Sequence, residues 1–389
     1  MVGGHLRPLR SKAPPDAPDA RPARAQYPSG MTSSDAVSPL DAEDLRVRVQ
    51  KRLDEFLCAQ VSILDDVSPD LAPLAESLTD LLRGGKRLRP AFAYWGWRGA
   101  GGADCEEAIT FATSLELLQA CALIHDDVMD GSDTRRGMPA AHRRFATLHR
   151  GNEWLGSSEM FGVGAAILLG DLCLSWADEM LMSCGLPPRS VMRGKPVYDV
   201  MRTELMAGQY LDLLEQARGG GSAERAMRVV RYKSAKYTIE RPLHLGAELA
   251  DASPDLVVAY SGYGLPLGEA FQLRDDVLGV FGDPKETGKP AGDDLREGKR
   301  TVLVATAAEA ASPAEAAVLR RRLGDPALDA EGIDELREII VGTGALRHVE
   351  ALIEALTEQC FRALDAAPVA DDAREVLRGL AVAATSRSV

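Results

Sequence analysis

The chain has 389 residues and a net charge of −13 at pH 7; 46% of the residues are hydrophobic and only 5% are aromatic. This acidic balance excludes nucleic acid as the main partner, and the hydrophobic fraction is sufficient for a large core. The six cysteines show no CxxC spacing, which favours reduced thiols in a cytoplasmic protein.

Residues 1–40 differ from the rest of the chain, because they are rich in Pro, Ala, Ser and Arg and lack a periodic apolar pattern. We predict a disordered extension there and a single domain over 41–389. The extension has no apolar segment of the kind found in secretory signals. Its three aspartates count against a transit peptide.

The remainder is predicted to consist of successive helices separated by Gly and Pro. A first helix is expected to be capped by Ser38 or Asp41 and to end near Leu64. Further helices are expected near 74–84, 90–99, 104–130, 158–184, 196–217, 223–250, 254–281 and 299–311, with several more toward the C-terminus. Since no strand pattern persists, the predicted fold class is all-α, a single-domain helical bundle with a central cavity.

No apolar run reaches the roughly 20 residues that span a bilayer. The apolar stretch from Phe161 to Leu174 is interrupted by Asp171 and is interpreted as a buried helix. No membrane span is therefore expected.

Two aspartate clusters stand about 150 residues apart, and each is followed by basic residues. The first contains Asp126, Asp127 and Asp130 in the segment HDDVMDGSDTRRG. Taken alone, such a cluster is more often a solvated helix face. Here an apolar run places it at the C-terminal end of a buried helix, where the helix dipole disfavours negative charge. Asp126 and Asp130 share a helix face, so we predict that a divalent metal compensates them.

The second cluster contains Asp275 and Asp276 and follows an equally apolar run. Two such helix ends facing each other would make a metal-lined cavity. Carboxylates hold Mg²⁺, and Mg²⁺ holds phosphate oxygens, so the pair predicts a diphosphate-binding site.

Basic segments accompany both clusters. One places Lys86, Arg87 and Arg89 beside a double-glycine turn, where the backbone can approach an anion closely. The others contain Arg135, Arg136, Lys233, Lys289 and Lys299. Any one of them alone is more often a surface charge. Together they predict two diphosphate sites, one bridged by metal and one held by cations only.

In this combination and order, the motifs resemble those of the trans-isoprenyl diphosphate synthases (polyprenyl synthetases), most of all the bacterial geranylgeranyl diphosphate synthases. They are GGKRLRP, LLQACALIHDDVMD, RRG, GQYLDL, KSAKY and FQLRDD. The resemblance covers about residues 45–385. It implies the isoprenoid synthase fold, three Mg²⁺ ions and a homodimer. It also implies head-to-tail condensation of isopentenyl diphosphate with dimethylallyl, geranyl or farnesyl diphosphate.

The resemblance implies a role for each matching residue. The metal ligands and their supporting carboxylates are Asp126, Asp127, Asp130, Asp275 and Asp276. The cations implied for the allylic diphosphate are Arg135, Lys233 and Lys289. The implied isopentenyl diphosphate site consists of Lys86, Arg89, Gln119 and Arg136. The groups implied to stabilise positive charge belong to Lys233, Ser234, Tyr237 and Gln272, with serine where the family usually has threonine.

The expected mechanism is ionisation of the allylic carbon–oxygen bond, helped by the cations and Mg²⁺ around the leaving diphosphate. The isopentenyl double bond attacks the cation, the departed diphosphate takes a proton, and the apolar cavity excludes water. One departure is Gly279, where many members carry a third aspartate. We expect weaker metal binding rather than inactivity there, with Asp283 as a compensating carboxylate.

Product length is predicted from the helix before Asp126, since one turn rises about 5.4 Å, roughly one isoprene unit. Cys121 and Ala122, one turn below, are small and disfavour a farnesyl stop. Leu118, a further turn down, would act as a floor for a twenty-carbon product, geranylgeranyl diphosphate. A floor near Phe161 or Leu168, and a longer product, stay open.

Two histidines are predicted to have structural rather than catalytic roles. His125 adjoins the aspartates, but Mg²⁺ prefers oxygen ligands, so it is interpreted as a packing or hydrogen-bonding residue. His142 is interpreted as a loop-ordering residue rather than a catalytic base.

Three other functions agree with only part of the sequence. A class I terpene cyclase shares the metal chemistry, but it needs no isopentenyl site and uses aromatic residues that are scarce here. A non-catalytic partner subunit would be expected to lose more of the charged residues. A purely structural helical protein leaves the paired clusters unexplained.

Overall fold

The structure is a computed structural model that describes residues 38–219, 221–283, 292–325 and 327–385. The N-terminal helices are α1 (Leu45–Val67), α2 (Ala72–Leu82), α3 (Leu88–Gly99), α4 (Glu106–Asp130), α5 (Ala141–Gly151), α6 (Ser158–Met182) and α7 (Pro188–Ala217). Short 3₁₀ turns, η1 (Pro39–Asp44) and η2 (Pro69–Leu71), precede α1 and α2.

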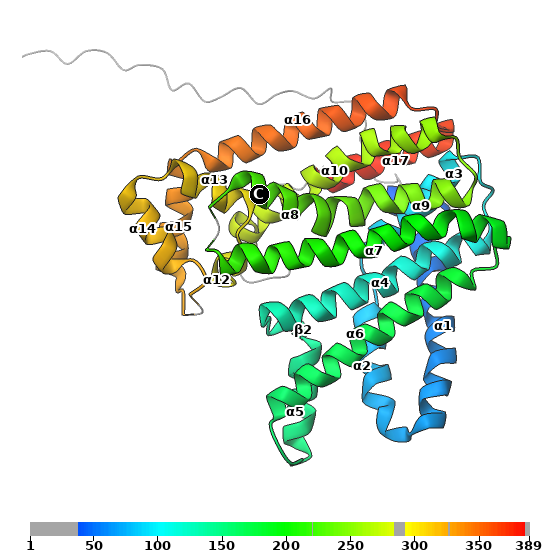
Figure 1. Cartoon of the computed structure of the whole chain (residues 1–389), viewed down its shortest axis with the longest axis horizontal. Coiled ribbons are helices and arrows are strands. Elements are labelled where there is room, and N and C mark those ends of the chain that lie inside the picture. The colour runs from blue at the N-terminus through cyan, green and yellow to red at the C-terminus, as the bar shows by residue number, and fades with distance from the viewer. Residues whose placement is uncertain (1–37, 220, 284–291, 326, 386–389) are drawn as a thin grey trace, which may run out of the picture. The chain divides into compact units, whose positions relative to one another are not determined.

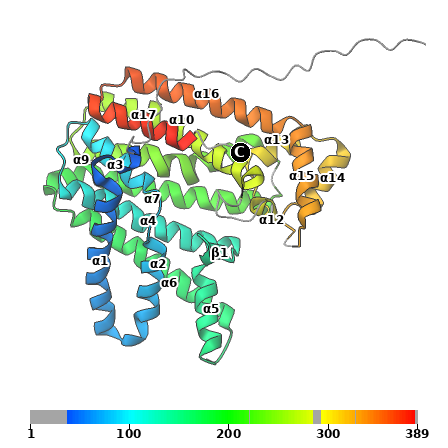
Figure 2. The same ribbon diagram turned by 180° about the vertical axis from the view of Figure 1, so that it is seen from behind.

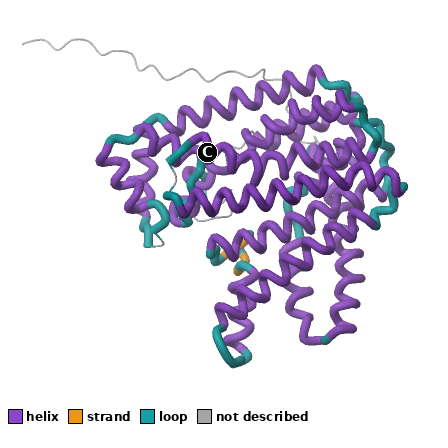
Figure 3. Tube along the Cα trace, in the orientation of Figure 1, coloured by secondary structure: helices purple, strands orange, loops and turns teal. Residues whose placement is uncertain are grey.

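The C-terminal half is also helical. Its elements are α8 (Ala223–Val229), the π-helix η3 (Val230–Glu240), α9 (Arg241–Leu249), α10 (Pro254–Phe281), α12 (Asp293–Arg296), α13 (Val302–Ala310), α14 (Pro313–Arg322), α15 (Ala330–Gly342), α16 (Ala345–Ala366) and α17 (Asp371–Thr385). Within the described ranges the strands are two dipeptides, β1 (Thr134–Arg135) and β2 (Met138–Pro139), which pair antiparallel (Figure 3). The predicted all-α class is confirmed.

Several predicted boundaries are corrected. The helix expected over 254–281 is observed there, but the one expected from 196 begins at Pro188 and passes through Pro196. The first helix begins later than expected, because Glu43 and Asp44 adopt positive φ values of 58° and 53° and separate η1 from α1. The helix α5 and the small ladder were not predicted. The segment 223–250 is a continuous helical rod whose middle is π-helical.

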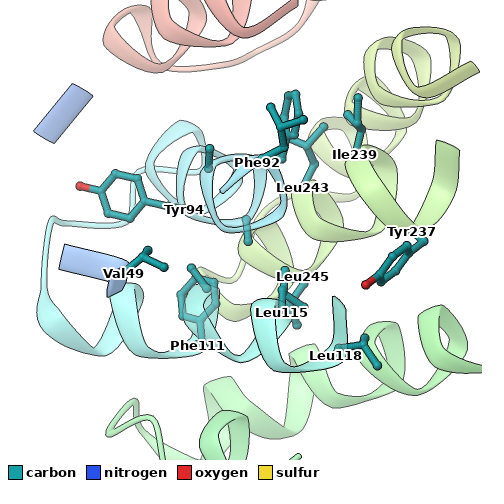
Figure 4. Close-up of a cluster of buried hydrophobic side chains, with 14 of the residues drawn as sticks. Val49, Phe92, Tyr94, Phe111, Leu115, Leu118, Tyr237, Ile239, Leu243 and Leu245 are labelled. Carbon is teal, nitrogen blue, oxygen red and sulfur yellow. The ribbon is translucent and has the colours of Figure 1, made fainter. Parts of the chain in front are cut away.

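The long helices pack side by side in both views of the ribbon (Figures 1 and 2). α4 packs along α6, α10 along α16 and η3, and α3 along α9. The core between them includes Phe111, Leu115 and Leu118 of α4 and Leu243 and Leu245 of α9, with Leu245 beside Leu115 and Leu243 beside Phe92 of α3 (Figure 4). Each of these side chains is fully buried, and burial of one such side chain stabilises the fold by about 1.5–3 kcal/mol.

The interpretation of the 161–174 segment as a buried helix was wrong in one respect. It is helical, within α6, but several of its apolar side chains face solvent: Phe161 is 40% exposed, Ile167 43% and Leu168 63%. By length and composition α4 and α6 would each be able to cross a membrane, although most of α4 is buried inside this fold. Core helices of soluble proteins pass the same test, so α6 is the helix whose apolar face needs an explanation.

Candidate active site

A cavity of about 720 Å³ lies between α4, α7, η3 and α10. Its lining brings together residues from both aspartate clusters, Asp126 from α4 and Asp275 and Asp276 from α10. The cations on its wall include Lys86, Arg89, Arg135, Arg136, Lys233 and Lys299, together with Arg87 and Arg300. Motifs separated by more than two hundred residues in the sequence, from Lys86 to Lys299, therefore converge on one space.

The first cluster ends α4. Gly131 adopts the left-handed conformation with φ 67° and terminates the helix directly after Asp130. The Asp126 carboxylate accepts hydrogen bonds from Lys233 Nζ at 3.0 Å and Gln209 Nε2 at 2.8 Å. Burial would raise the pKa of Asp126, but Lys233 and Lys299 outweigh it and hold that pKa below its usual value.

The other two aspartates of α4 have different surroundings. Asp127 is buried and accepts hydrogen bonds from Arg135 Nε at 2.9 and 3.2 Å, so it orients that guanidinium. Asp130 has a buried carboxylate oxygen with no hydrogen-bond partner among the described residues. Burial, together with the nearby Asp126 carboxylate, raises the pKa of Asp130 to about 6.

The second cluster lies on α10. Asp276 accepts a hydrogen bond from Gln272 Nε2 at 2.8 Å, and burial raises the pKa of Asp276 to about 8. Beside it, a Cβ added to Gly279 would lie 1.9 Å from Asp294 Oδ2. The Asp294 carboxylate therefore occupies the space next to Gly279, whereas Asp283, the expected compensating group, is exposed to solvent.

The groups assigned to isopentenyl diphosphate gather on one side of the cavity. Arg89 donates from Nη2 to Thr238 Oγ1 at 2.8 Å, and its guanidinium carbon lies 4.3 Å from the centre of the Tyr237 ring. The Tyr237 hydroxyl donates to Gln119 Oε1 at 2.8 Å. Arg136 donates to the Leu81 carbonyl at 3.0 Å.

The surroundings of Arg136 show that positive charge is in excess on this side of the cavity. Burial lowers the pKa of Arg136, and the neighbouring guanidinium groups of Arg87, Arg135 and Arg89 lower it further, although Glu116 opposes them. A partly buried cation among other cations is stabilised by an anion, so this wall suits a phosphate group.

Arg87 behaves differently from the other cations of its segment. It is 3% exposed and donates to Glu116, to Gln50 Oε1 at 2.6 Å and to the Leu82 carbonyl at 2.5 Å. These bonds fix the double-glycine turn onto α1 and α4. The sequence grouped Arg87 with the anion-binding cations, but its guanidinium anchors the loop.

The π-helix η3 supplies the residues of the KSAKY motif. Lys233 Nζ bridges Asp126 Oδ1 at 3.0 Å and Asp212 Oδ2 at 2.6 Å, and Ser234 lines the cavity. Asp212 and Gln209 were missed as site residues although the GQYLDL motif was noted. Their i, i+3 spacing on α7 was the available signal. Lys289 lies outside the described residues.

The residues predicted to set the chain length differ in whether they reach the cavity. Ala122 lines the cavity, whereas Cys121 and Leu118 are fully buried beneath its wall. Figure 4 shows Leu118 near Tyr237. The alternative floor at Phe161 is not supported within this chain, because that ring packs against Trp154 at 5.3 Å near the end of α5.

The two histidine interpretations have different outcomes. His125 forms a hydrogen bond through Nε2 with the Ile167 carbonyl at 3.1 Å, which confirms its hydrogen-bonding role. His142 is buried at the start of α5, directly after the loop, and its loop-ordering role stays a prediction.

The donor set fits magnesium. Among the described residues there is no compact group of three or more His, Cys, Asp or Glu side chains that would enclose a metal. Mg²⁺ is usually bound by one or two carboxylates, with waters and substrate phosphates completing its shell. Asp126 and the unpartnered oxygen of Asp130 provide that type of oxygen site.

Comparisons with known proteins agree with this geometry. The sequence model of the family "Polyprenyl synthetase" matches residues 72–340. The geranylfarnesyl diphosphate synthase of Aeropyrum pernix is 33% identical over 319 residues, covering 80% of this chain and 92% of that protein. The geranylgeranyl diphosphate synthase of Saccharolobus solfataricus is 32% identical over 259 residues, covering 66% of this chain and 73% of that protein.

A solved structure is closer still. The geranylgeranyl pyrophosphate synthase from Corynebacterium glutamicum, complexed with isoprenyl diphosphate and magnesium, superposes with a TM-score of 0.85 and 44% identity. The match covers 88% of this chain and 99% of that one. On the evidence of its sequence and its fold, the chain belongs to the polyprenyl synthetase family.

Proposed function

We propose that this prenyltransferase condenses isopentenyl diphosphate with an allylic diphosphate, head to tail, to form geranylgeranyl diphosphate. The observation that carries the proposal is that two groups of charged residues line one cavity. Aspartates of α4 and α10 lie on its wall with nearby cations, and the cations beside Gln119 form a second group without those aspartates. A single-substrate cyclase would have no use for the second group.

The allylic diphosphate is assigned to the space beside Asp126. Arg135 and Lys233 stand next to that carboxylate, and both are cations that bind phosphate oxygens. Lys289 is proposed as a third cation of this site. Mg²⁺, when bound by Asp126, Asp130 and Asp275, supplies positive charge that stabilises the leaving diphosphate.

Isopentenyl diphosphate is assigned to Lys86, Arg89, Gln119 and Arg136. Arg87 is not part of this set, because its bonds to Glu116 and Gln50 hold the loop that presents Lys86 and Arg89. Tyr237 links the two sites, since its hydroxyl bonds Gln119 and its ring lies against Arg89.

The protein residues around the reacting carbon stabilise positive charge. The Lys233 carbonyl, the Ser234 hydroxyl and the Tyr237 oxygen offer partial negative charge to an allylic cation. Gln272 donates its NH₂ group to Asp276, which directs the oxygen end of the amide toward an acceptor role. Apolar wall residues such as Leu205 and Phe271 exclude water, and the departed diphosphate is the proposed base.

The proposed twenty-carbon product rests on Ala122, a small side chain on the cavity wall one turn below Asp126. Ala122→Phe would block this path, so we expect a shift to fifteen carbons or fewer. Ala330→Phe, an exposed position on α15, serves as the control and should keep the wild-type product. An unchanged product from Ala122→Phe would mean that the tail takes another route.

The exposed apolar face of α6 and α7 supports a homodimer. Met160 (69% exposed) and Leu168 (63%) lie on α6, and Met192 and Tyr210 (both 65%) lie on α7. We propose that a second copy of the chain covers this face in the cytoplasm, rather than lipid. Light scattering of the wild type and of Leu168→Glu tests this, with a dimer expected for the first and weakened association for the second.

Incubation of the purified protein with Mg²⁺, isopentenyl diphosphate and each of the dimethylallyl, geranyl and farnesyl primers tests the function directly. A dominant linear twenty-carbon diphosphate supports the proposal, and a twenty-five-carbon product would follow the Aeropyrum relative instead. Hydrocarbon formed without isopentenyl diphosphate would favour a cyclase, and no turnover would favour a non-catalytic subunit.

A further inference from the structure

The π-helix η3 is an unusual backbone for residues that must be placed accurately. π-helical turns are rare and concentrate at functional sites. This one extends over Val230–Glu240 and presents Lys233, Ser234 and Tyr237 to the cavity. Its shape must be imposed by the helices packed against it.

Two glycines touch the η3 backbone at neighbouring points. A Cβ on Gly208 of α7 would lie 2.4 Å from the Lys233 nitrogen and 2.7 Å from its Cα. A Cβ on Gly268 of α10 would lie 2.6 Å from the Ala235 Cα and 2.7 Å from its carbonyl oxygen. These atoms belong to the backbone, so a side chain at either glycine would displace η3 itself.

The two contacts flank Ser234, since one falls on the residue before it and the other on the residue after it. Ion pairs hold the same segment to α7: Glu204, one turn before Gly208, lies 3.4 Å from Lys236 Nζ and accepts from Arg241 Nε at 2.7 Å. α7 and α10 thus fix η3 on both sides of Ser234, where Lys233 and Ser234 line the cavity.

We propose that Gly208 and Gly268 are positioning residues for the ionisation step, acting through the backbone of η3. The inference rests on the proposed function, because it assigns the Lys233 carbonyl and Ser234 hydroxyl to the allylic cation. A displacement of about 1 Å in a catalytic group can lower a rate by about 100-fold. An added methyl group requires a shift of that order at Lys233 or Ala235.

The test compares Gly208→Ala and Gly268→Ala with two matched glycine controls. The position of Gly96 is equally crowded, because an added Cβ would lie 2.5 Å from the Leu243 carbonyl oxygen. This contact is between α3 and α9, so Gly96→Ala does not act directly on η3. Gly262→Ala is on α10, where the nearest atom is the Ala363 Cβ at 3.4 Å. Unfolding temperatures and single-turnover rates are measured for all four at a temperature where each is folded.

We expect Gly208→Ala and Gly268→Ala to lower the single-turnover rate about 30–100-fold, with the KM for isopentenyl diphosphate within about threefold of wild type. Gly96→Ala should lose comparable thermal stability but keep its rate within about threefold. Gly262→Ala should match wild type in both. Equal rates for Gly208→Ala and Gly96→Ala, or a loss confined to KM, would overturn the proposal.

Glu204→Gln extends the test if the alanine variants do not fold, because it weakens the ion pairs on η3 without adding volume. A rate loss of about tenfold with an unchanged KM for isopentenyl diphosphate supports the proposed positioning of η3. An unchanged rate contradicts it. Failure of the wild type to turn over would count against the proposed function. The ratios of single-turnover rates between folded variants test the positioning role of the two glycines.

Discussion

The two aspartate clusters lie in the last two turns of two apolar helices, yet the protein surrounds them differently. On α4, Asp126 is paired with Lys233 and Asp127 with Arg135. On α10, Asp276 is bonded by the neutral amide of Gln272 and has a pKa raised by burial to about 8. The first cluster is balanced by protein cations, and the second keeps a buried carboxyl that favours its proton.

This difference suggests a division of labour. On α4, Asp126 is ionised and held by Lys233 and Gln209 before any ligand arrives, which suits a ligand of the metal ions that carry the allylic diphosphate. The α10 carboxylates lie at the other side of the cavity, where ionisation of Asp276 is favoured only when positive charge is brought in. The α4 cluster should therefore tolerate change least.

The largest effect is expected from the leading aspartates. Asp126→Ala should lower kcat by about 10³-fold or more, because it removes a metal ligand and leaves Lys233 without one of its partners. The loss of kcat in Asp275→Ala should be roughly tenfold smaller than the loss in Asp126→Ala. Steady-state kinetics over a range of Mg²⁺ concentrations measure both, and equal losses would remove the proposed asymmetry.

The second aspartates should differ in stability rather than in rate. In metal-free protein, Asp127→Asn removes the nearest counter-charge of the Arg135 guanidinium, leaving the more distant Asp126, and should destabilise the fold by about 2–3 kcal/mol. Asp276→Asn keeps a neutral partner for Gln272 and should be neutral or stabilising at pH 8.5. Chemical denaturation in the presence of a chelator measures both free energies of unfolding.

The pH dependence of that comparison has a definite sign. The folded pKa of Asp276, about 8, lies above its unfolded value of about 4. The folded state therefore holds more protons between these values, so this group's contribution is present at low pH and is lost as pH rises through 8. Asp276→Asn should gain about 2 kcal/mol relative to wild type between pH 6 and pH 8.5. A constant difference across that range would show that Asp276 ionises normally.

The smallest effect is expected at Gly279. Gly279→Asp restores the third aspartate, but its Cβ would lie 1.9 Å from Asp294 Oδ2, so the Asp294 carboxylate must move. We expect the Mg²⁺ concentration for half-maximal activity to change by about two- to fivefold, since one outer carboxylate is worth about 1 kcal/mol. Unchanged magnesium dependence would show that Gly279 does not weaken metal binding. Gly342→Asp, at an open position at the end of α15 and away from the proposed dimer face, controls for the added charge.

Much of the site was predictable because the motifs are local. Asp126, Asp275, Asp276, Gln119 and the predicted cations within the described residues line or adjoin the cavity, and α10 was predicted to the residue. The misses share a cause. Asp212, Gln209 and Asp294 become site residues only through contacts with distant segments, and Arg87 was misassigned because its partners Glu116 and Gln50 lie on other helices.

The sequence by itself determined the helical class, the family and most of the charged residues that face the diphosphates, because helix periodicity and short motifs are properties of neighbouring residues. Only the tertiary structure decided which charged side chains pair with one another. It also decided that the KSAKY segment is π-helical and that Gly208 and Gly268 contact its backbone. Those outcomes depend on the distance between backbones that are remote in the chain, and packing alone sets that distance.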